Sequence, residues 1–108
     1  MEKRYKDSGY GYRDVAVLVS AGYGAGWFTW GMPEEALFDP IIVDFVEADK
    51  INSIEFEEYM ESEYPDTYLG GADGLYVRWV QEGKEFIIDE YDGAESLTLK
   101  ENFTWIKA

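Results

Sequence analysis

The chain has 108 residues, a length that suits one domain with a single modest core. Apolar residues make up 46% of the sequence and aromatic residues 18%, which excludes intrinsic disorder as the default interpretation. Acidic residues number 23 and basic residues 9, so the formal net charge is −14. A field of this sign repels phosphate backbones, acidic membranes and anionic substrates, and therefore argues against direct binding of nucleic acid.

Two residue types are missing from the sequence, and their absence narrows the possible chemistry. Without cysteine the chain has no disulfide, no thiolate nucleophile and no cysteine-based zinc site. Without histidine it lacks the usual general base. We therefore expect a protein that is not an enzyme, with no metal site and no cofactor. The charged start lacks a secretory signal, and the apolar runs are too short to span a bilayer, so we expect a cytoplasmic location.

The charge is distributed unevenly along the chain. Residues 1–13 contain four basic side chains and only two acidic ones, and we expect this segment to form a flexible basic arm. Between Asp14 and Val77 there are fourteen acidic residues and a single basic one, Lys50. No linker interrupts the remainder of the sequence, which predicts a single domain over residues 14–108.

The first predicted element is a buried strand over residues 14–20, where apolar and β-branched residues follow one another. A glycine-rich turn follows at residues 22–26. Residues 27–30 then form either a second strand or an aromatic loop. The Asp39-Pro40 pair is typical of a helix start, and apolar residues continue at helical spacing to Val46. Strand is the alternative for this segment, because it contains Ile41, Ile42 and Val43.

A second helix is predicted from Asn52, which can cap its start, to the residue before Pro65. Its apolar stripe consists of Phe56, Tyr59, Met60 and Tyr64. Three strands should follow, over residues 75–80, 85–91 and 95–100, and residues 103–106 could add an edge strand. Hairpin turns are predicted at residues 81–84 and at Asp92-Gly93. The expected fold is α+β, with an antiparallel sheet of about four to five strands and two helices packed on one face.

The second helix carries the first candidate site, a protein-binding surface made of carboxylates. The helix contains no lysine or arginine, and Glu57 and Glu61 repel each other at i,i+4 spacing. Such a face does nothing to stabilise the helix itself. This favours a functional role for the negative charge, which would attract a basic partner. The predicted acidic face consists of Glu55, Glu57, Glu58, Glu61, Asp44 and Glu47.

The glycine and aromatic segment at residues 22–30 is the second candidate site. Tyr23, Trp27 and Trp30 are rigid, amphipathic side chains of the kind enriched at binding hot spots. Gly24 and Gly26 could bring backbone amides close to a phosphate, but the G-x-G-x-G spacing and the Trp-Phe-Thr-Trp that follows do not match a dinucleotide fingerprint. The structural alternative is a tight turn over which aromatic rings pack.

Three segments carry a resemblance to a known group of proteins. These are residues 17–30, which contain Gly-Tyr-Gly-Ala-Gly-Trp, and residues 69–73 and 85–93. Over most of residues 14–99 the chain resembles small uncharacterised proteins of tailed bacteriophages and prophages. The resemblance implies a phage gene expressed in the cytoplasm of a bacterial host, and it transfers no functional residue.

The leading hypothesis is a phage accessory protein that inhibits or modulates a host factor, such as a defence protein. Its acidic surface would imitate nucleic acid and bind a basic, nucleic-acid-binding partner. One alternative is a small-molecule or nucleotide-signal binder that uses residues 22–30. Another is an oligomeric virion or scaffold component.

Overall fold

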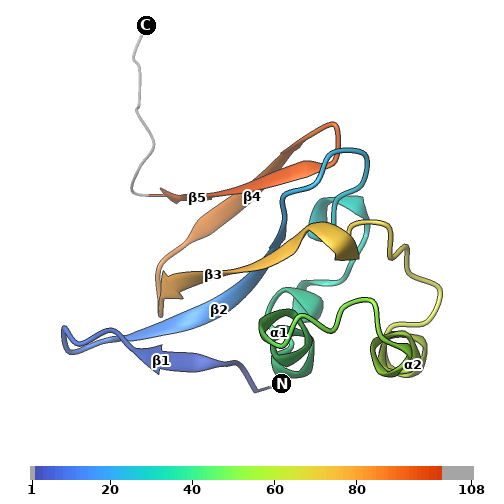
Figure 1. The fold of residues 1–108 in the computed structure, drawn as a ribbon. Helices are drawn as coiled ribbons and strands as arrows, with labels where there is room; N and C mark the ends of the chain where they lie inside the picture. The colour runs from blue at the N-terminus through green and yellow to red at the C-terminus, as the bar shows by residue number, and fades with distance from the viewer. Residues whose placement is uncertain (1, 101–108) are drawn as a thin grey trace, which may run out of the picture.

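The chain folds into two small antiparallel sheets and two helices, in a computed structural model that describes residues 2–100 (Figure 1). The first sheet has the order β1-β2-β3, and its strands are β1 (Tyr5–Asp7), β2 (Arg13–Ser20) and β3 (Leu75–Gln81). The second sheet is a hairpin of β4 (Phe86–Tyr91) and β5 (Ala94–Leu99). The helices are α1 (Pro40–Glu47) and α2 (Ile54–Glu63), with short 3₁₀ turns η1 (Phe28–Trp30), η2 (Glu34–Leu37) and η3 (Ala72–Gly74).

The predicted α+β class is confirmed, but the five described strands do not form one sheet. The predicted hairpin at residues 81–84 is wrong, because β3 pairs with β2 and not with β4. Of the two central residues of this turn, only Gly83 has a positive φ (88°), a pattern that suits a type II turn and splays the flanking strands. At the second turn both Asp92 (φ 51°) and Gly93 (φ 88°) are positive, as a type I′ turn requires, and the predicted hairpin there is confirmed.

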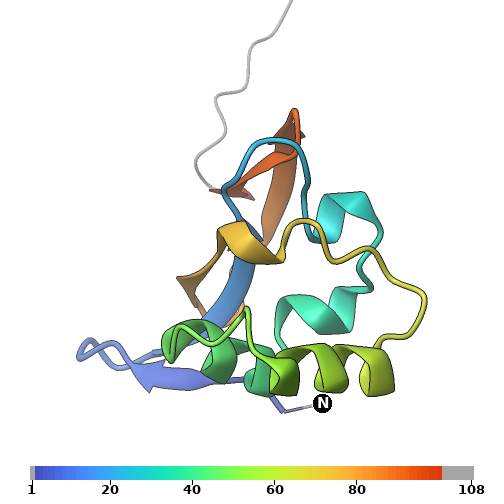
Figure 2. The ribbon, with the colours of Figure 1, turned by 45° about the vertical axis from the view of Figure 1, so that its right-hand side comes forward.

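β2 is buried on both of its faces, which explains its almost continuous apolar sequence. Ala16 and Leu18 belong to a core cluster that includes residues of α1, α2 and Trp27. Val17 and Val19 belong to a second cluster with Leu97 of β5, against which β4 and η2 also pack. The helices thus cover one face of the three-stranded sheet, and the hairpin covers the other. In Figures 1 and 2 the green helices and the orange hairpin lie on different sides of β2 and β3.

Both helices begin at capping side chains. The Asp39 carboxylate accepts hydrogen bonds from the amides of Ile41 (2.8 Å) and Ile42 (3.3 Å), with Pro40 as the first residue of α1, as predicted. For α2 the predicted cap, Asn52, is wrong by one residue. Ser53 caps the helix instead, because its hydroxyl both donates to Lys50 O (2.7 Å) and accepts from Phe56 N (3.2 Å).

The N-terminal segment, expected as a flexible basic arm, contains β1, which pairs with the start of β2. Its basic side chains contact the domain. Arg4 binds Asp44 of α1, Arg13 binds Glu82, and Lys6 Nζ lies 4.5 Å from the centre of the Trp79 ring. Electrostatic and cation–π contacts with the acidic, aromatic domain thus accompany the strand pairing of this segment. Residues 103–106, predicted as an edge strand, lie outside the described residues.

Candidate protein-binding surfaces

The outward side of α2 presents a row of carboxylates. Phe56, Met60 and Tyr64 are buried on the inner side, as the predicted stripe requires. The outer residues are exposed, and within residues 2–100 none of them has an ion-pair or hydrogen-bond partner for its carboxylate; they are Glu55, Glu57, Glu58 and Glu61. The sequence prediction of an acidic, solvent-facing side of this helix agrees with this placement.

The spacing of these carboxylates resembles that of charges along a nucleic-acid strand. Glu55 and Glu61 are six residues apart, which corresponds to about 9 Å of helix axis at about 1.5 Å per residue. Four charges over this length give about one charge per 3 Å, compared with one per about 3.4 Å along a single strand of B-DNA. The linear charge density of α2 therefore falls in the range of the polyanion that it was predicted to imitate.

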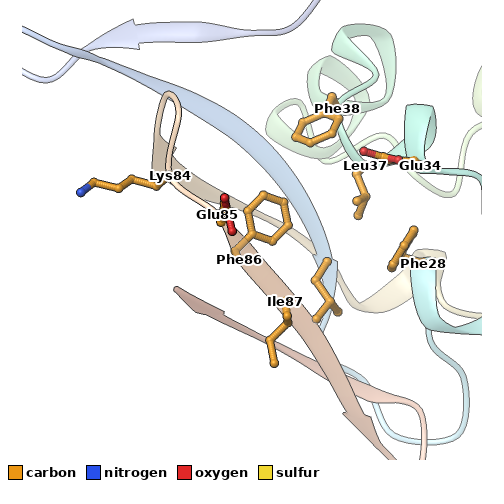
Figure 3. A pocket seen from close by; sticks show the side chains of 9 residues that line it. Phe28, Glu34, Leu37, Phe38, Lys84, Glu85, Phe86 and Ile87 are labelled. Carbon is orange, nitrogen blue, oxygen red and sulfur yellow. The ribbon is translucent and has the colours of Figure 1, made fainter. Parts of the chain in front are cut away.

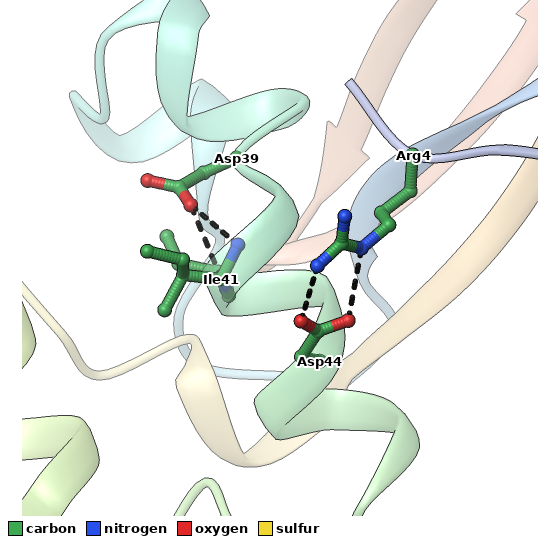
Figure 4. A network of polar contacts seen from close by, with 5 residues as sticks. Arg4, Asp39, Ile41 and Asp44 are labelled. Atoms are coloured by element: carbon green, nitrogen blue, oxygen red, sulfur yellow. Dashed lines mark hydrogen bonds and ion pairs between the residues drawn. The ribbon is translucent and has the colours of Figure 1, made fainter. Parts of the chain in front are cut away.

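Asp44 does not belong to this unpaired surface. Its two carboxylate oxygens accept hydrogen bonds from Arg4, at 3.0 Å from Nε and 2.5 Å from Nη2 (Figure 4). The bonds from Arg4 lower the pKa of Asp44 below its ordinary value, and the pair carries no net charge. Asp44, predicted as part of the acidic face, is thus exposed but paired with Arg4, a contact that the sequence does not show because it depends on the position of β1 beside α1. Glu47 is exposed near the end of α1.

The glycine and aromatic segment divides into a buried part and an exposed part. Trp27 is fully buried, and its indole N–H points to Ala36 O at 3.4 Å, so the predicted surface role of Trp27 is wrong. Tyr23 (76% exposed) and Trp30 (41% exposed) remain on the surface. Trp30 stacks on Tyr68, with 5.8 Å between the ring centres. Of the predicted aromatic site, two of the three rings are available to a partner.

The backbone amides of this segment already bind an anion, which is the carboxylate of Glu95 in β5. Oε2 accepts hydrogen bonds from the amides of Trp27 (2.9 Å) and Thr29 (2.8 Å) and from the Thr29 hydroxyl (2.7 Å), and Oε1 accepts from the amide of Ser20 (2.9 Å). Gly24 N donates to Asp92 O, and Gly26 is buried. The donors that a nucleotide phosphate would need at Trp27 and Thr29 are therefore occupied.

Sequence reasoning missed Glu95, although the sequence contained a signal for it. Glu95 alternates with Leu97 and Leu99, so it lies on the inward face of β5 at a position that pattern alone assigns to an apolar residue. Only 5% of its surface is exposed. A buried carboxylate is tolerated where hydrogen bonds satisfy it, and here the end of β2, the loop before η1 and η1 itself provide them.

A second buried carboxylate joins the two helices. Besides capping α1, Asp39 accepts hydrogen bonds through Oδ2 from the hydroxyls of Tyr59 (2.5 Å) and Tyr64 (2.6 Å) of α2 and its C-cap. Burial, together with these bonds to Asp39, raises the pKa of both phenols far above the ordinary value of 10. Both groups therefore stay neutral donors, and the network fixes α2 against α1.

An apolar groove runs between β4 and the η1–η2 segment and encloses about 510 Å³ (Figure 3). Its apolar lining comes from both sides and consists of Phe28, Leu37, Phe38, Phe86, Ile87 and Ile88. Glu34 stands on one rim, and Lys84 and Glu85 stand on the other. The sequence analysis did not identify this groove, because it depends on the hairpin packing beside η2 and not on pairing of β4 with β3.

No comparison with protein-family models, curated proteins or solved structures gave a match to the chain. Within residues 2–100 no group of three or more acidic side chains is placed to hold a metal ion. None of the helices described there has the length and apolar character needed to traverse a bilayer.

Proposed function

We propose that the protein is a non-enzymatic accessory protein that binds a basic, nucleic-acid-binding factor of a bacterial host and inhibits or modulates it. The binding surface is the acidic face of α2, defined as Glu55, Glu57, Glu58 and Glu61. The proposal includes origin from a bacteriophage, action in the host cytoplasm and a role against host defence. These parts depend on the resemblance of residues 17–30, 69–73 and 85–93 to phage proteins.

One observation carries the proposal, namely that the acidic face is unpaired although pairing would stabilise the helix. Glu57 and Glu61 repel each other at i,i+4 spacing at a cost of about 0.2–0.5 kcal/mol at low salt. Glu61 and Glu63 lie in the last turn, where the partial negative charge of the helix end disfavours carboxylates. Lysine at position 61 would relieve the repulsion and suit the helix end, whereas Glu55 and Glu57 lie in the first turn, where the positive end of the helix favours carboxylates. A helix that keeps the charges is suited to a cationic surface, where release of counterions and electrostatic steering favour the complex.

The test begins with the isolation of a partner and then measures how that partner binds. The protein, immobilised at low salt, is exposed to a bacterial lysate and eluted with a salt gradient. The purified partner is then titrated at several salt concentrations and in competition with a DNA duplex. We expect affinity to fall steeply with salt, and we expect DNA and the protein to displace each other.

A matched pair of variants locates the surface. The triple variant Glu57→Lys, Glu58→Lys, Glu61→Lys should abolish binding. A control with the same change in net charge, Asp73→Lys, Asp89→Lys and Glu35→Lys, alters three exposed acids outside α2 and should keep most of the affinity. Binding that is insensitive to salt, or an equal loss in both variants, would show that the acidic face does not form the contact.

A further inference from the structure

β4 has a backbone edge that pairs with nothing in the described part of the chain. In the hairpin, Lys100 N donates to Glu85 O (2.9 Å), and Tyr91 pairs with Ala94 across the two-residue turn. Because hydrogen-bonded and non-hydrogen-bonded pairs alternate in an antiparallel ladder, the odd-numbered residues of β4 face β5 with their backbone groups. The N–H and C=O of Phe86 and Ile88 therefore point away from β5, and within residues 2–100 no backbone bond reaches them.

The same two residues place their side chains in the apolar groove. Phe86 and Ile88 are both half-buried, and the opposite wall is formed by Phe28, Leu37 and Phe38. Figure 3 shows Phe86 directed toward this wall and Ile87 directed away from it. An unpaired strand edge beside an apolar groove matches the requirements of β-strand addition, in which backbone bonds give affinity and pockets accept alternate side chains.

The negative charge of the molecule indicates which kind of segment could pair with β4. Glu34 on the groove rim is exposed and has no ion-pair partner within residues 2–100, and the chain as a whole carries −14. A second copy of this chain would bring the same large negative charge, which opposes its approach. The opposite rim carries Lys84 and Glu85, and Glu85 pairs with Lys100, so the attraction comes from Glu34 and from the overall charge. A segment with basic residues between its apolar ones would be attracted by these charges while its apolar side chains enter the groove.

We propose that β4 docks an extended segment of a partner protein in which apolar and basic residues alternate, through the backbone groups of Phe86 and Ile88 and the adjoining groove. The added strand lengthens the β4–β5 hairpin to three strands. This interaction does not depend on the acidic face of α2, and one site can exist without the other.

A peptide of alternating valine and lysine, four of each and blocked at both ends, serves as the probe. We expect it to bind the full chain and to shift the amide resonances of residues 86–88. Two further peptides carry N-methyl groups on either the valine or the lysine amides. In a strand only alternate amides face the neighbour, so one methylated peptide should lose about tenfold or more in affinity and the other should retain most of it. A peptide of alternating valine and glutamate should bind much more weakly.

Variants of the protein test the same contact from the other side. Ile88→Pro removes the outward N–H of β4 without removing a hydrogen bond to β5, and it should weaken binding of the valine–lysine peptide by about tenfold. The triple variant of the acidic face should still show the difference between the two methylated peptides. Equal affinities of the methylated peptides, or resonance shifts confined to α2, would overturn the proposal and indicate simple charge attraction.

Hydrogen exchange of the free protein distinguishes the other possible occupants of the groove. We expect the amides of Phe86 and Ile88 to exchange rapidly when no peptide is present. Slow exchange that is independent of protein concentration would mean that this chain itself covers the edge, for example with residues 101–108. Slow exchange that appears only at high concentration would mean that a second copy covers it. Either result would overturn the assignment of the groove to a partner protein.

Discussion

Replacing Glu95 by glutamine tests whether the loop before η1 is held by an internal anion. The wild-type carboxylate accepts four hydrogen bonds, three at Oε2 and one at Oε1. Glutamine has nearly the same shape but only one acceptor oxygen. If that oxygen takes the position of Oε2, the glutamine NH₂ group faces the amide of Ser20, and two donors then meet in a buried site.

The expected cost follows from the four bonds. A buried N–H left without an acceptor costs about 1–3 kcal/mol, and exchanging a charged for a neutral acceptor weakens each remaining bond by about 1 kcal/mol. The substitution also relieves the cost of burying a charge, which offsets part of this loss. We expect Glu95→Gln to lower the free energy of unfolding by about 2–4 kcal/mol, out of the roughly 5–15 kcal/mol typical of a domain.

The assay is urea unfolding at pH 7, followed by the fluorescence of the tryptophans, of which Trp27 is buried beside the network. Glu90→Gln is the matched control, because Glu90 lies opposite Glu95 in the hairpin register and is exposed, and within residues 2–100 its carboxylate accepts only from Gly93 N. This control should cost less than about 1 kcal/mol. If the free energy of unfolding of Glu95→Gln lies within about 0.5 kcal/mol of the wild-type value, a neutral side chain satisfies these donors equally well, and the role assigned to the carboxylate is refuted.

The other carboxylates give further predictions about stability. Tyr64→Phe removes a buried donor from Asp39 and should cost about 1.5–3 kcal/mol in urea unfolding, more than Tyr59→Phe at the half-buried position. Because the pKa of both phenols is raised in the folded state, their contribution to the free energy of unfolding is present below pH 10 and is lost as the pH rises above it. The stability of Tyr64→Phe should therefore depend less on alkaline pH than that of wild type. Asp44→Asn should lower the free energy of unfolding at pH 7, and the loss should become smaller as the pH falls below about 3.8. The reason is that Arg4 lowers the pKa of Asp44, so the stability from this pair is lost when the carboxylate is protonated. If wild type and variant differ in free energy of unfolding by the same amount at pH 3 and pH 7, the pairing is contradicted.

Elements with strong local signals could be predicted from the sequence. The apolar run of β2, the Asp39-Pro40 start of α1, the apolar stripe of α2 and the Asp92-Gly93 hairpin all depend on residues a few positions apart. The acidic outer side of α2 could be predicted for the same reason, since helical periodicity alone places Glu58 opposite Phe56 and Met60.

The features that could not be predicted depend on contacts between distant parts of the chain. The register of β2 with β3, residues about sixty positions apart, leaves β4 outside the first sheet. The burial of Trp27 and the pairing of Arg4 with Asp44 likewise depend on how distant segments pack, which cannot be predicted from the spacing of residues in the sequence. The groove beside β4 follows from the same separation of the two sheets.

The division of the strands between two sheets has a consequence for how the chain folds. The β4–β5 hairpin contains only neighbouring residues and a favoured turn, so it can form within microseconds. Pairing of β2 with β3 must instead close a loop of more than fifty residues, and this step should limit the rate. Because the amides of Ser20, Trp27 and Thr29 bind Glu95 together, we expect the hairpin to dock only after these segments have assembled, and Glu95 to make the contacts that complete this step.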